Sequence, residues 1–354
     1  MKIGNYENAM RPAMLLACIV AFTVAYSADA APALIPAPRE MALTKGTCAR
    51  AAEPTVERVA GISAEGYELS VKPDGVTIRA SDDAGEFYAR QTLAQLKDGE
   101  TFPCCEIKDS PRFKWRGVHV DDVRHFLGKE QVKRTIDQIS KYKFNVFHWH
   151  LTDDQAWRIA VPGYPKLTGK GGCYTADDIR EVVAYAAERH IKIVPEVDFP
   201  GHFKAVSRAY PAFACDTGGA CKKGKAPMCV GNHDAVKFVE AALDAVCDLF
   251  PGSKIIHIGG DECRRDYWKD CPKCKAMMAR EGMSKPQDLQ AWITRNAVNY
   301  LAAKGRRAIG WDEMLDAKDG DLPASVMGMR WHEKGAARTA RAARVSILGP
   351  CRCT

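Results

Sequence analysis

Apolar residues along this chain fall into two spacings that alternate from residue 113 onward, and these spacings predict alternating strands and helices. Short apolar runs predict seven strands: Gly117–Asp121, Asn145–His150, Ile191–Val197, Lys254–Gly259, Arg307–Trp311, Ser325–Trp331 and Arg344–Leu348. Between the earlier runs, apolar residues spaced three or four positions apart, such as Val132, Ile136 and Ile139, predict helices. Apolar strands separated by helices are typical of parallel sheets covered by helices. A closed barrel and a doubly wound sheet both fit this pattern, although no glycine fingerprint for a dinucleotide follows the first strand.

The preceding segment, residues 31–112, has a different pattern and predicts a small α+β domain. Apolar residues alternate from Tyr67 to Val71 and again from Val76 to Ala80, with Lys72-Pro-Asp-Gly75 between the two runs, which indicates a hairpin. A helix is predicted from about Asp83 to Lys97. We therefore divide the chain into residues 1–30, residues 31–112 and a barrel-type domain at residues 113–354.

Composition narrows the class of protein. With 354 residues, 46% of them hydrophobic and 27% charged, the chain is expected to fold. The net charge of +7 is not concentrated in a basic block with aromatic residues, so nucleic-acid binding is not expected.

Residues 1–30 have the pattern of an export signal, with Lys2 and Arg11 before an apolar run and small residues up to Ala30. The sequence around Cys18 is also compatible with a lipoprotein cleavage site, but the apolar run continues past it, so simple export to the periplasm or the medium is favoured. No later segment is apolar enough to predict a transmembrane span.

Export makes disulfides a reasonable expectation for several of the 14 cysteines. Cys215, Cys221 and Cys229 lie in a Gly/Lys-rich loop that resembles a stapled insertion. Cys271 and Cys274 could form half of a zinc site, but no second pair follows at ribbon or finger spacing, so we expect disulfides or free thiols there.

Charged and aromatic residues gather where the predicted strands end. The candidates are Asp121, Arg124, His150, Asp153, Glu196, Asp198, His202, Asp261, Glu262, Trp311, Glu313 and Trp331. In a βα barrel the carboxyl ends of the strands form the edge where active sites are built. Asp122 and Asp154 are instead interpreted as helix caps.

Asp261 and Glu262 form the pair that acid–base chemistry requires. Two adjacent carboxyl groups in a partly dry pocket retain one proton longer, because the second charge is disfavoured. Tryptophan rings stack on the C–H face of sugars, and arginine supplies fixed donors for hydroxyl groups. Acids, arginine and tryptophans together indicate a carbohydrate hydrolase, whereas a surface salt-bridge network would not account for the tryptophans.

Several motifs resemble glycoside hydrolase family 20, the β-N-acetylhexosaminidases. These motifs are Arg116–Phe126, Lys143–Arg158, Val194–His202, His257–Glu262 and Gly310–Glu313. The resemblance implies a (β/α)8-type TIM barrel after a small α+β domain. It also implies exo-acting hydrolysis of terminal β-linked GlcNAc or GalNAc with retention, in which the sugar's own acetamido oxygen forms an oxazolinium intermediate.

The same resemblance implies a role for each site residue. Glu262 would be the acid and base, Asp261 would orient the acetamido group, and Arg124 would bind the 3- and 4-hydroxyls. Asp153 and His202 would form a polar network, with Trp311 and Trp331 as walls of the acetamido pocket. Further members of the polar network are Asp198, Glu196, His150 and Glu313. No metal ion or organic cofactor is implied.

The sequence ends at Thr354, before the Tyr-x-Asp stretch and eighth strand that the resemblance leads one to expect, so we predict about seven strands and an incomplete barrel. A chain of this kind could be a weakly active or inactive glycan-binding relic. A third interpretation, a conventional two-carboxylate glycosidase, would use Glu313 as nucleophile. The choice of GlcNAc or GalNAc, the natural glycan and the oligomeric state do not follow from the sequence.

Overall fold

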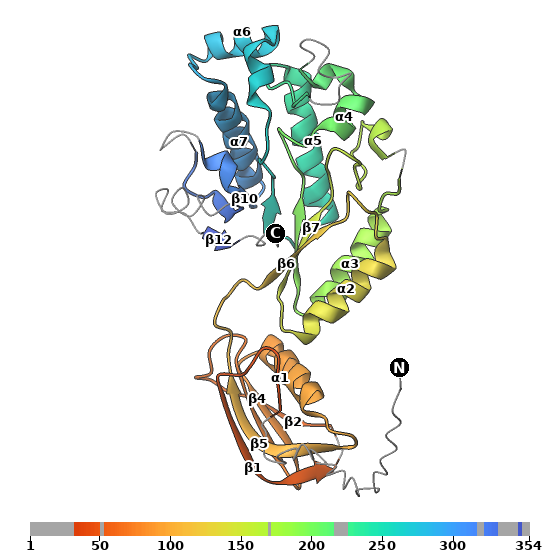
Figure 1. Ribbon diagram of the computed structural model, residues 1–354, viewed down its shortest axis with the longest axis vertical. Coiled ribbons are helices and arrows are strands. Elements are labelled where there is room, and N and C mark those ends of the chain that lie inside the picture. Colours follow the sequence, from red (N-terminus) through yellow and green to blue (C-terminus); the bar gives the residue numbers. More distant parts are fainter. Residues whose placement is uncertain are drawn as a thin grey trace, which may run out of the picture. The chain divides into compact units, whose positions relative to one another are not determined.

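The structure is a computed structural model that describes residues 32–49, 53–168, 171–215, 226–316 and 322–331, and the backbone of residues 346–348 (Figure 1). The predicted leader at residues 1–30, with Cys18, lies outside the described residues, as do Cys221 and residues 349–354. Among the helices of the described part, none is long and apolar enough to cross a membrane.

A five-stranded sheet precedes the barrel domain, in the order β1-β5-β3-β4-β2. Its strands are β1 (Glu40–Ala49), β2 (Thr55–Arg58), β3 (Tyr67–Lys72), β4 (Gly75–Ala80) and β5 (Thr101–Asp109). Strands β3 and β4 form the predicted antiparallel hairpin, and helix α1 (Asp83–Leu96) follows as predicted. Leu69, Ile78 and Ile107 from one face of the sheet pack with Tyr88 and Leu96 of α1 to form the core of this part.

The second sheet has seven strands in the order β12-β11-β10-β9-β8-β7-β6. They are β6 (Gly117–Asp121), β7 (Val146–His150), β8 (Lys192–Glu196), β9 (Ile255–His257), β10 (Arg307–Trp311), β11 (Met327–Arg330) and β12 (Ser346–Leu348). Each neighbouring pair is parallel. Because the spatial order follows the chain order without reversal, the sheet winds in one direction, as in a βα barrel and unlike a doubly wound sheet.

Helices connect these strands and cover the sheet (Figure 1). They are α2 (Lys129–Lys141), α3 (Ala176–Ala187), α4 (Lys204–Ala209), α5 (His233–Leu249), α6 (Pro272–Arg280) and α7 (Pro286–Ala303), with short 3-10 helices at Pro165–Thr168, Pro211–Phe213, Arg265–Lys269 and Asp312–Asp316. Apolar faces of α2, α3, α5 and α7 pack in one large core with residues of the strands. The predicted capping box at α3 is present, since Thr175 and Asp178 exchange hydrogen bonds at its first turn.

Candidate active site

The loop after β9 carries Asp261 and Glu262, and its backbone needs two glycines. Gly259 and Gly260 have φ angles of +63° and +100°, and Glu262 itself is at +46°. A Cβ atom on Gly259 would lie 1.8 Å from the Asp198 carboxylate, so only glycine permits this close approach. The same carboxylate accepts a hydrogen bond of 3.0 Å from the Gly260 backbone N–H. The loop is thereby fixed against the segment that follows β8.

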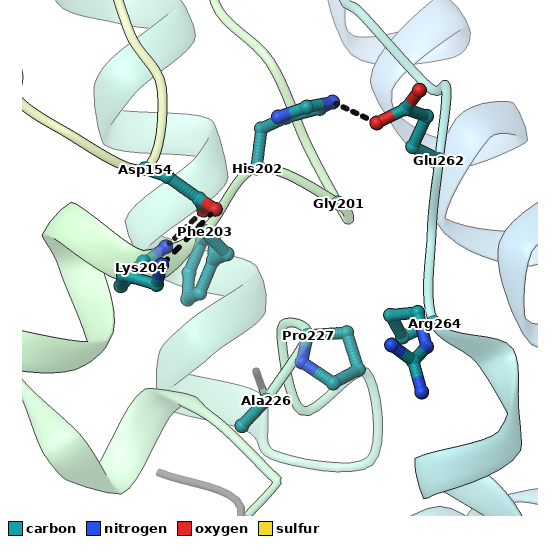
Figure 2. Close-up of a pocket in the computed structure, with 9 residues that line it drawn as sticks. All are labelled: Asp154, Gly201, His202, Phe203, Lys204, Ala226, Pro227, Glu262 and Arg264. Carbon is teal, nitrogen blue, oxygen red and sulfur yellow. Dashed lines mark hydrogen bonds and ion pairs between the residues drawn. The ribbon is translucent and has the colours of Figure 1, made fainter. Parts of the chain in front are cut away.

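That neighbouring segment positions His202 toward the acid pair. Gly201 lies against the Asp261 carbonyl, where a Cβ atom would come within 2.5 Å of the oxygen, and His202 follows at a φ of +43°. The Nε2 atom of His202 lies 3.5 Å from the Asp261 carboxylate and 3.8 Å from that of Glu262, the second contact being visible in Figure 2. Both predicted carboxylates therefore face the same imidazole ring.

His202 also connects the acid pair to Asp153, because its Nδ1 lies 3.0 Å from Asp153 Oδ1. Burial opposes the charged form of this ring, but hydrogen bonds with Asp153 and Asp261 outweigh burial and raise the pKa of His202 to about 12. The ring is consequently an imidazolium at neutral pH, placed between two carboxylates. It can hold them in position and counter their charge.

A cavity of about 240 Å³ opens beside this cluster (Figure 2). It is lined by Asp154, Gly201, His202, Phe203, Lys204, Ala226, Pro227, Glu262 and Arg264. The Glu262 side chain is 54% exposed, whereas that of Asp261 is 11% exposed. Glu262 is thus the member of the pair that solvent and ligand can reach.

The interpretation of Asp122 and Asp154 as caps of the helices that directly follow them is wrong. Asp154 accepts a hydrogen bond of 3.0 Å from the backbone N–H of Lys204, fifty residues later, at the first residue of α4. Asp122 is fully buried and accepts from the Leu127 backbone and from the Trp149 indole at 2.7 and 2.8 Å. Asp122 organises the loop after β6, whereas Asp154 holds the start of α4 and not of the helix that directly follows it.

Arg124 lies in the loop after β6 and is held by two acids. Asp121 Oδ1 accepts from the Arg124 backbone N–H, while Asp121 Oδ2 lies 3.0 Å from the guanidinium. The same Nη1 atom lies 2.7 Å from Asp153 Oδ2. The guanidinium is therefore fixed at one end, and 39% of the side chain remains exposed.

Asp153 is the centre of this charge cluster. Its carboxylate is buried and contacts Arg124, His202 and also His150, whose Nε2 lies at 2.8 Å. Burial alone would raise the pKa of Asp153, but the hydrogen bonds from His150 and His202 hold it below the usual range of a carboxyl group. For His150, the Glu196 carboxylate and the bond to Asp153 outweigh burial and raise the pKa to about 10.

The pKa of Asp198 is shifted in the opposite direction to that of Asp153. It is buried, and burial together with the neighbouring charge of Asp261 raises its pKa well above the ordinary value of an aspartate. The carboxylates of Asp198 and Asp261 and the ring of His202 have atoms within 4.8 Å of one another. Burial and the nearby Asp261 carboxylate thus favour the protonated form of Asp198, a residue that the sequence argument had not singled out for this role.

Sequence reasoning assigned no role to three histidines inside the barrel, His119, His148 and His257. Glu196 is fully buried, and its carboxylate lies 2.8 Å from His148, 2.9 Å from His150, 3.1 Å from His257 and 3.4 Å from His119. His148 and His119 stand two positions before residues that were identified, His150 and Asp121. Because side chains alternate along a strand, that spacing of two was a signal that they share the inner face.

The side chains of Trp311 and Trp331 lie next to each other but differ in solvent exposure. Trp311 is only 3% exposed, and its indole donates to Glu196 at 3.0 Å. Trp331 is partly buried, and the two ring centres lie 4.8 Å apart at 63°. The Trp331 backbone N–H is held at 2.6 Å by Asp312. Trp331 is therefore the more accessible of the two aromatic surfaces, with Trp311 as its support.

Glu313 does not lie across the pocket from Glu262. Its carboxylate accepts a hydrogen bond of 3.1 Å from the Glu262 backbone N–H. This bond supports the left-handed conformation of Glu262 from the side of β10. The position is that of a residue that holds the acid in place, and it disfavours a role for Glu313 as an opposing nucleophile.

Comparisons with known proteins agree with these motifs. The family described as "Glycosyl hydrolase family 20, catalytic domain" matches residues 113–348, and "Glycosyl hydrolase family 20, domain 2" matches residues 45–110. A Beta-hexosaminidase of Porphyromonas gingivalis is 38% identical over an alignment of 308 residues that covers 78% of this chain and 39% of the relative. One from Akkermansia muciniphila is 34% identical over 86% of this chain and 66% of its own length.

Solved structures give the same result. A beta-N-acetylhexosaminidase from Bacteroides fragilis aligns with a TM-score of 0.80 at 30% identity, covering 89% of this chain and 74% of that one. A GH20 exo beta-N-acetylglucosaminidase from Vibrio harveyi, in complex with N-acetylglucosamine, also scores 0.80 at 27% identity, covering 88% and 60%. The chain spans 39%, 46% and 66% of the first three curated relatives. These likenesses support a TIM-barrel-like fold.

Proposed function

Because the chain belongs to glycosyl hydrolase family 20, we propose that it removes terminal β-linked N-acetylhexosamine residues from glycans by exo-acting hydrolysis with retention. One observation carries this proposal: Asp261 and Glu262 converge on the same protonated imidazole, at 3.5 and 3.8 Å, beside a cavity at the carboxyl edge of a parallel sheet. Such an edge is where βα barrels carry out their chemistry.

The proposed mechanism uses the sugar's own 2-acetamido group as nucleophile. Glu262, the exposed member of the pair, would protonate the leaving oxygen as the acetamido oxygen attacks the anomeric carbon. The glycosidic bond then breaks and an oxazolinium forms. Water, deprotonated by the same Glu262, would open that ring and restore the acetamido group with the original anomeric configuration.

Asp261 would orient the acetamido group. Its carboxylate can accept a hydrogen bond from the amide N–H. It can also stabilise the positive charge that develops on the acetamido group in the transition state. A protonated His202 counters the resting charge of Asp261 and keeps its position. Burial and the adjacent Asp261 carboxylate raise the pKa of Asp198, so Asp198 binds a proton more readily than an ordinary aspartate.

Substrate binding would use the remaining residues at the edge. Arg124 is fixed by Asp121 and Asp153, so its free donors are preorganised for a pair of hydroxyl groups. Trp331, supported by Trp311, offers an aromatic surface for the acetamido methyl or the sugar face. The Vibrio harveyi structure, named as a complex with N-acetylglucosamine, supports a GlcNAc-type ligand for this chain.

The proposal is tested with a chromogenic aryl N-acetyl-β-glucosaminide and the Glu262→Gln variant. We expect turnover by the parent chain and a fall of at least about 10²–10³-fold in kcat for the variant, with substrate still bound. Gln retains the size of the side chain, so folding should be maintained. Binding without turnover that depends on Glu262 would instead identify a glycan-binding relic. Equal turnover of a plain glucoside would favour the two-carboxylate alternative.

Export of the protein is also a proposal, supported by the pattern of residues 1–30. Fractionation of cells that express the full chain should recover the protein outside the cytoplasm with residues 1–30 removed. A lipidated Cys18 at the new amino terminus would support the lipoprotein alternative, and an uncut cytoplasmic chain would contradict both.

A further inference from the structure

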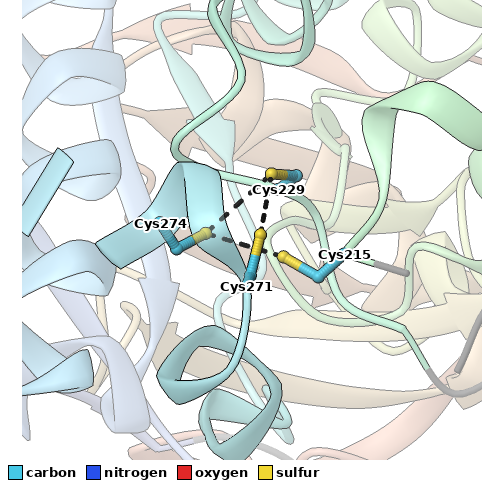
Figure 3. A group of neighbouring side chains, drawn as sticks. All are labelled: Cys215, Cys229, Cys271 and Cys274. Carbon is cyan, nitrogen blue, oxygen red and sulfur yellow. Dashed lines mark hydrogen bonds between the residues drawn. The ribbon is translucent and has the colours of Figure 1, made fainter. Parts of the chain in front are cut away.

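Four cysteine sulfurs lie close together, two from the segment that contains Cys215 and Cys229 and two from the start of α6 (Figure 3). The Sγ atoms of Cys215 and Cys274 lie 3.6 Å apart, those of Cys229 and Cys271 also 3.6 Å, and those of Cys229 and Cys274 3.9 Å. All four residues are buried. No second pair follows Cys271 and Cys274 at ribbon or finger spacing, but the fold brings two further sulfurs close to them from 42 and 59 residues away.

The backbone at each side is arranged to present these sulfurs. Cys215 and Cys229 lie on a short ladder, in which the Cys215 N–H donates to Pro227 at 3.1 Å and the Cys229 N–H donates to Phe213 at 2.8 Å. Cys271 is the N-cap residue of α6 and Cys274 lies in its first turn. A short loop and a helix start, each with two cysteines, thus face one another.

Gly231 fits these two segments together. A Cβ atom at this position would lie 2.3 Å from the carbonyl group of Lys273 and 2.5 Å from the Cys274 backbone nitrogen. Only glycine allows the loop that carries Cys229 to approach the turn between Cys271 and Cys274 so closely. The cluster therefore depends on a tight backbone contact and not only on four side chains that happen to be neighbours.

The distances match the geometry of one metal ion. Zinc bound by four thiolates has Zn–S bonds of about 2.3 Å, which places tetrahedral sulfurs about 3.8 Å apart. The separations observed here, 3.6 to 3.9 Å, agree with that edge length. A disulfide would instead require a bond of about 2.0 Å. The four sulfurs also do not separate into two pairs, because Cys274 is close to both Cys215 and Cys229.

We propose that Cys215, Cys229, Cys271 and Cys274 bind a structural Zn²⁺ ion that joins the loop at residues 226–232 to helix α6. Binding deprotonates the four thiols, releases their protons to solvent and forms four Zn–S bonds, with no change in oxidation state. The partial positive charge at the start of α6 favours the thiolates of Cys271 and Cys274. All four positions are occupied by protein, which is typical of a structural site and not of a catalytic one.

The ion would support one wall of the catalytic cavity. Ala226 and Pro227, directly before Met228 and Cys229, line that cavity. The Met228 backbone N–H donates to Pro200 at 3.0 Å, two residues before His202, and the Trp268 indole donates to the Met228 carbonyl at 2.9 Å. Loss of the ion is therefore expected to loosen the wall and weaken substrate binding, although no zinc-bound group takes part in the chemistry.

The test is the metal and thiol content of the full chain, purified without chelators or reducing agents. We expect about one equivalent of zinc per chain by elemental mass spectrometry, displaced by a mercurial reagent that reacts with the cluster thiols. Replacement by Co²⁺ should give the visible absorption of tetrahedral thiolate coordination. These readouts do not depend on glycosidase activity, so they are independent of the proposed function.

Variants give a second measurement. Cys274→Ser should lose the zinc and lower Tm, while the control Cys173→Ser, at a partly exposed cysteine outside the cluster, should retain one equivalent of zinc. If Cys274→Ser does not fold, the metal content of the parent chain still decides. A parent chain with no zinc and two disulfides among the four residues would overturn the proposal, and so would four free thiols with no metal.

Discussion

Two buried aspartates in the site, Asp153 and Asp198, should differ strongly in how much stability and activity they lose when each is replaced by asparagine. The hydrogen bonds from His150 and His202 outweigh burial and hold the pKa of Asp153 low, so this residue is a carboxylate. Burial and the charge of Asp261 raise the pKa of Asp198 well above its ordinary value, which favours the protonated form of this residue. Asparagine has nearly the shape of either side chain but only the charge of the protonated one.

The magnitude follows from the contacts of each carboxyl group. Asp153 lies 2.7 Å from Arg124, 2.8 Å from His150 and 3.0 Å from His202, and it is 1% exposed. Replacement by a neutral amide removes the one anion that these three cationic groups share, a change that costs roughly 3–5 kcal/mol for a buried ion pair. If the same cluster positions the catalytic groups, kcat/KM should fall about 10²–10³-fold.

For Asp198→Asn the expected loss is much smaller. The asparagine oxygen can still accept the 3.0 Å hydrogen bond from the Gly260 backbone N–H, and the neutral amide places no charge beside Asp261. A change within about 1 kcal/mol is therefore expected, the size of one neutral hydrogen bond. Urea unfolding at pH 7 and kcat/KM on an aryl N-acetyl-β-glucosaminide measure both quantities. If Asp198→Asn is as damaging as Asp153→Asn, Asp198 is ionised and the assigned charges are incorrect.

Two further predictions concern stability. The pKa of His150 is raised to about 10 in the folded chain, against 6.5 in the unfolded chain. The stability that the protonated ring contributes is complete below pH 6.5. It is lost as the pH rises toward 10, by up to about 1.4 kcal/mol per pH unit. Urea unfolding at pH 7 and pH 9 should therefore give a steeper decline for the parent chain than for His150→Gln, and equal slopes would contradict the assignment. Gly259→Ala should lower stability by about 1–3 kcal/mol and reduce activity, because its Cβ would overlap Asp198. The control Gly252→Ala, which meets no atom within 4 Å, should be nearly neutral, and similar losses in urea unfolding for both variants would refute the close-approach argument.

Those parts of the fold that have a strong local pattern could be predicted from the sequence. Apolar runs such as Val146–His150 and amphipathic helices such as α2 have periodicity within a few residues, and both follow from the sequence alone. Strand β1 was missed because most of its residues are exposed, so its apolar positions do not alternate. The choice between barrel and doubly wound sheet depended on the spatial order of strands, which no local pattern contains.

The residues of the candidate site could also be predicted only in part. Residues at strand ends, such as Asp261 and His202, could be predicted because the carboxyl edge of a parallel sheet collects them. The raised pKa of Asp198 could not be predicted, because it depends on contacts across two loops. The four-cysteine cluster was missed for a similar reason, since Cys215 and Cys274 meet only through the folded backbone around Gly231.

The central claim is that the sugar's acetamido oxygen attacks the anomeric carbon while Glu262 supplies the proton. Its most direct test is the rate of hydrolysis of aryl N-acyl-β-glucosaminides whose acetyl group carries none, one, two or three fluorine atoms. Fluorine withdraws electron density from the carbonyl oxygen, so the account predicts that kcat/KM falls steeply with each added fluorine. A rate that stays constant across the series would contradict participation of the substrate's own amide.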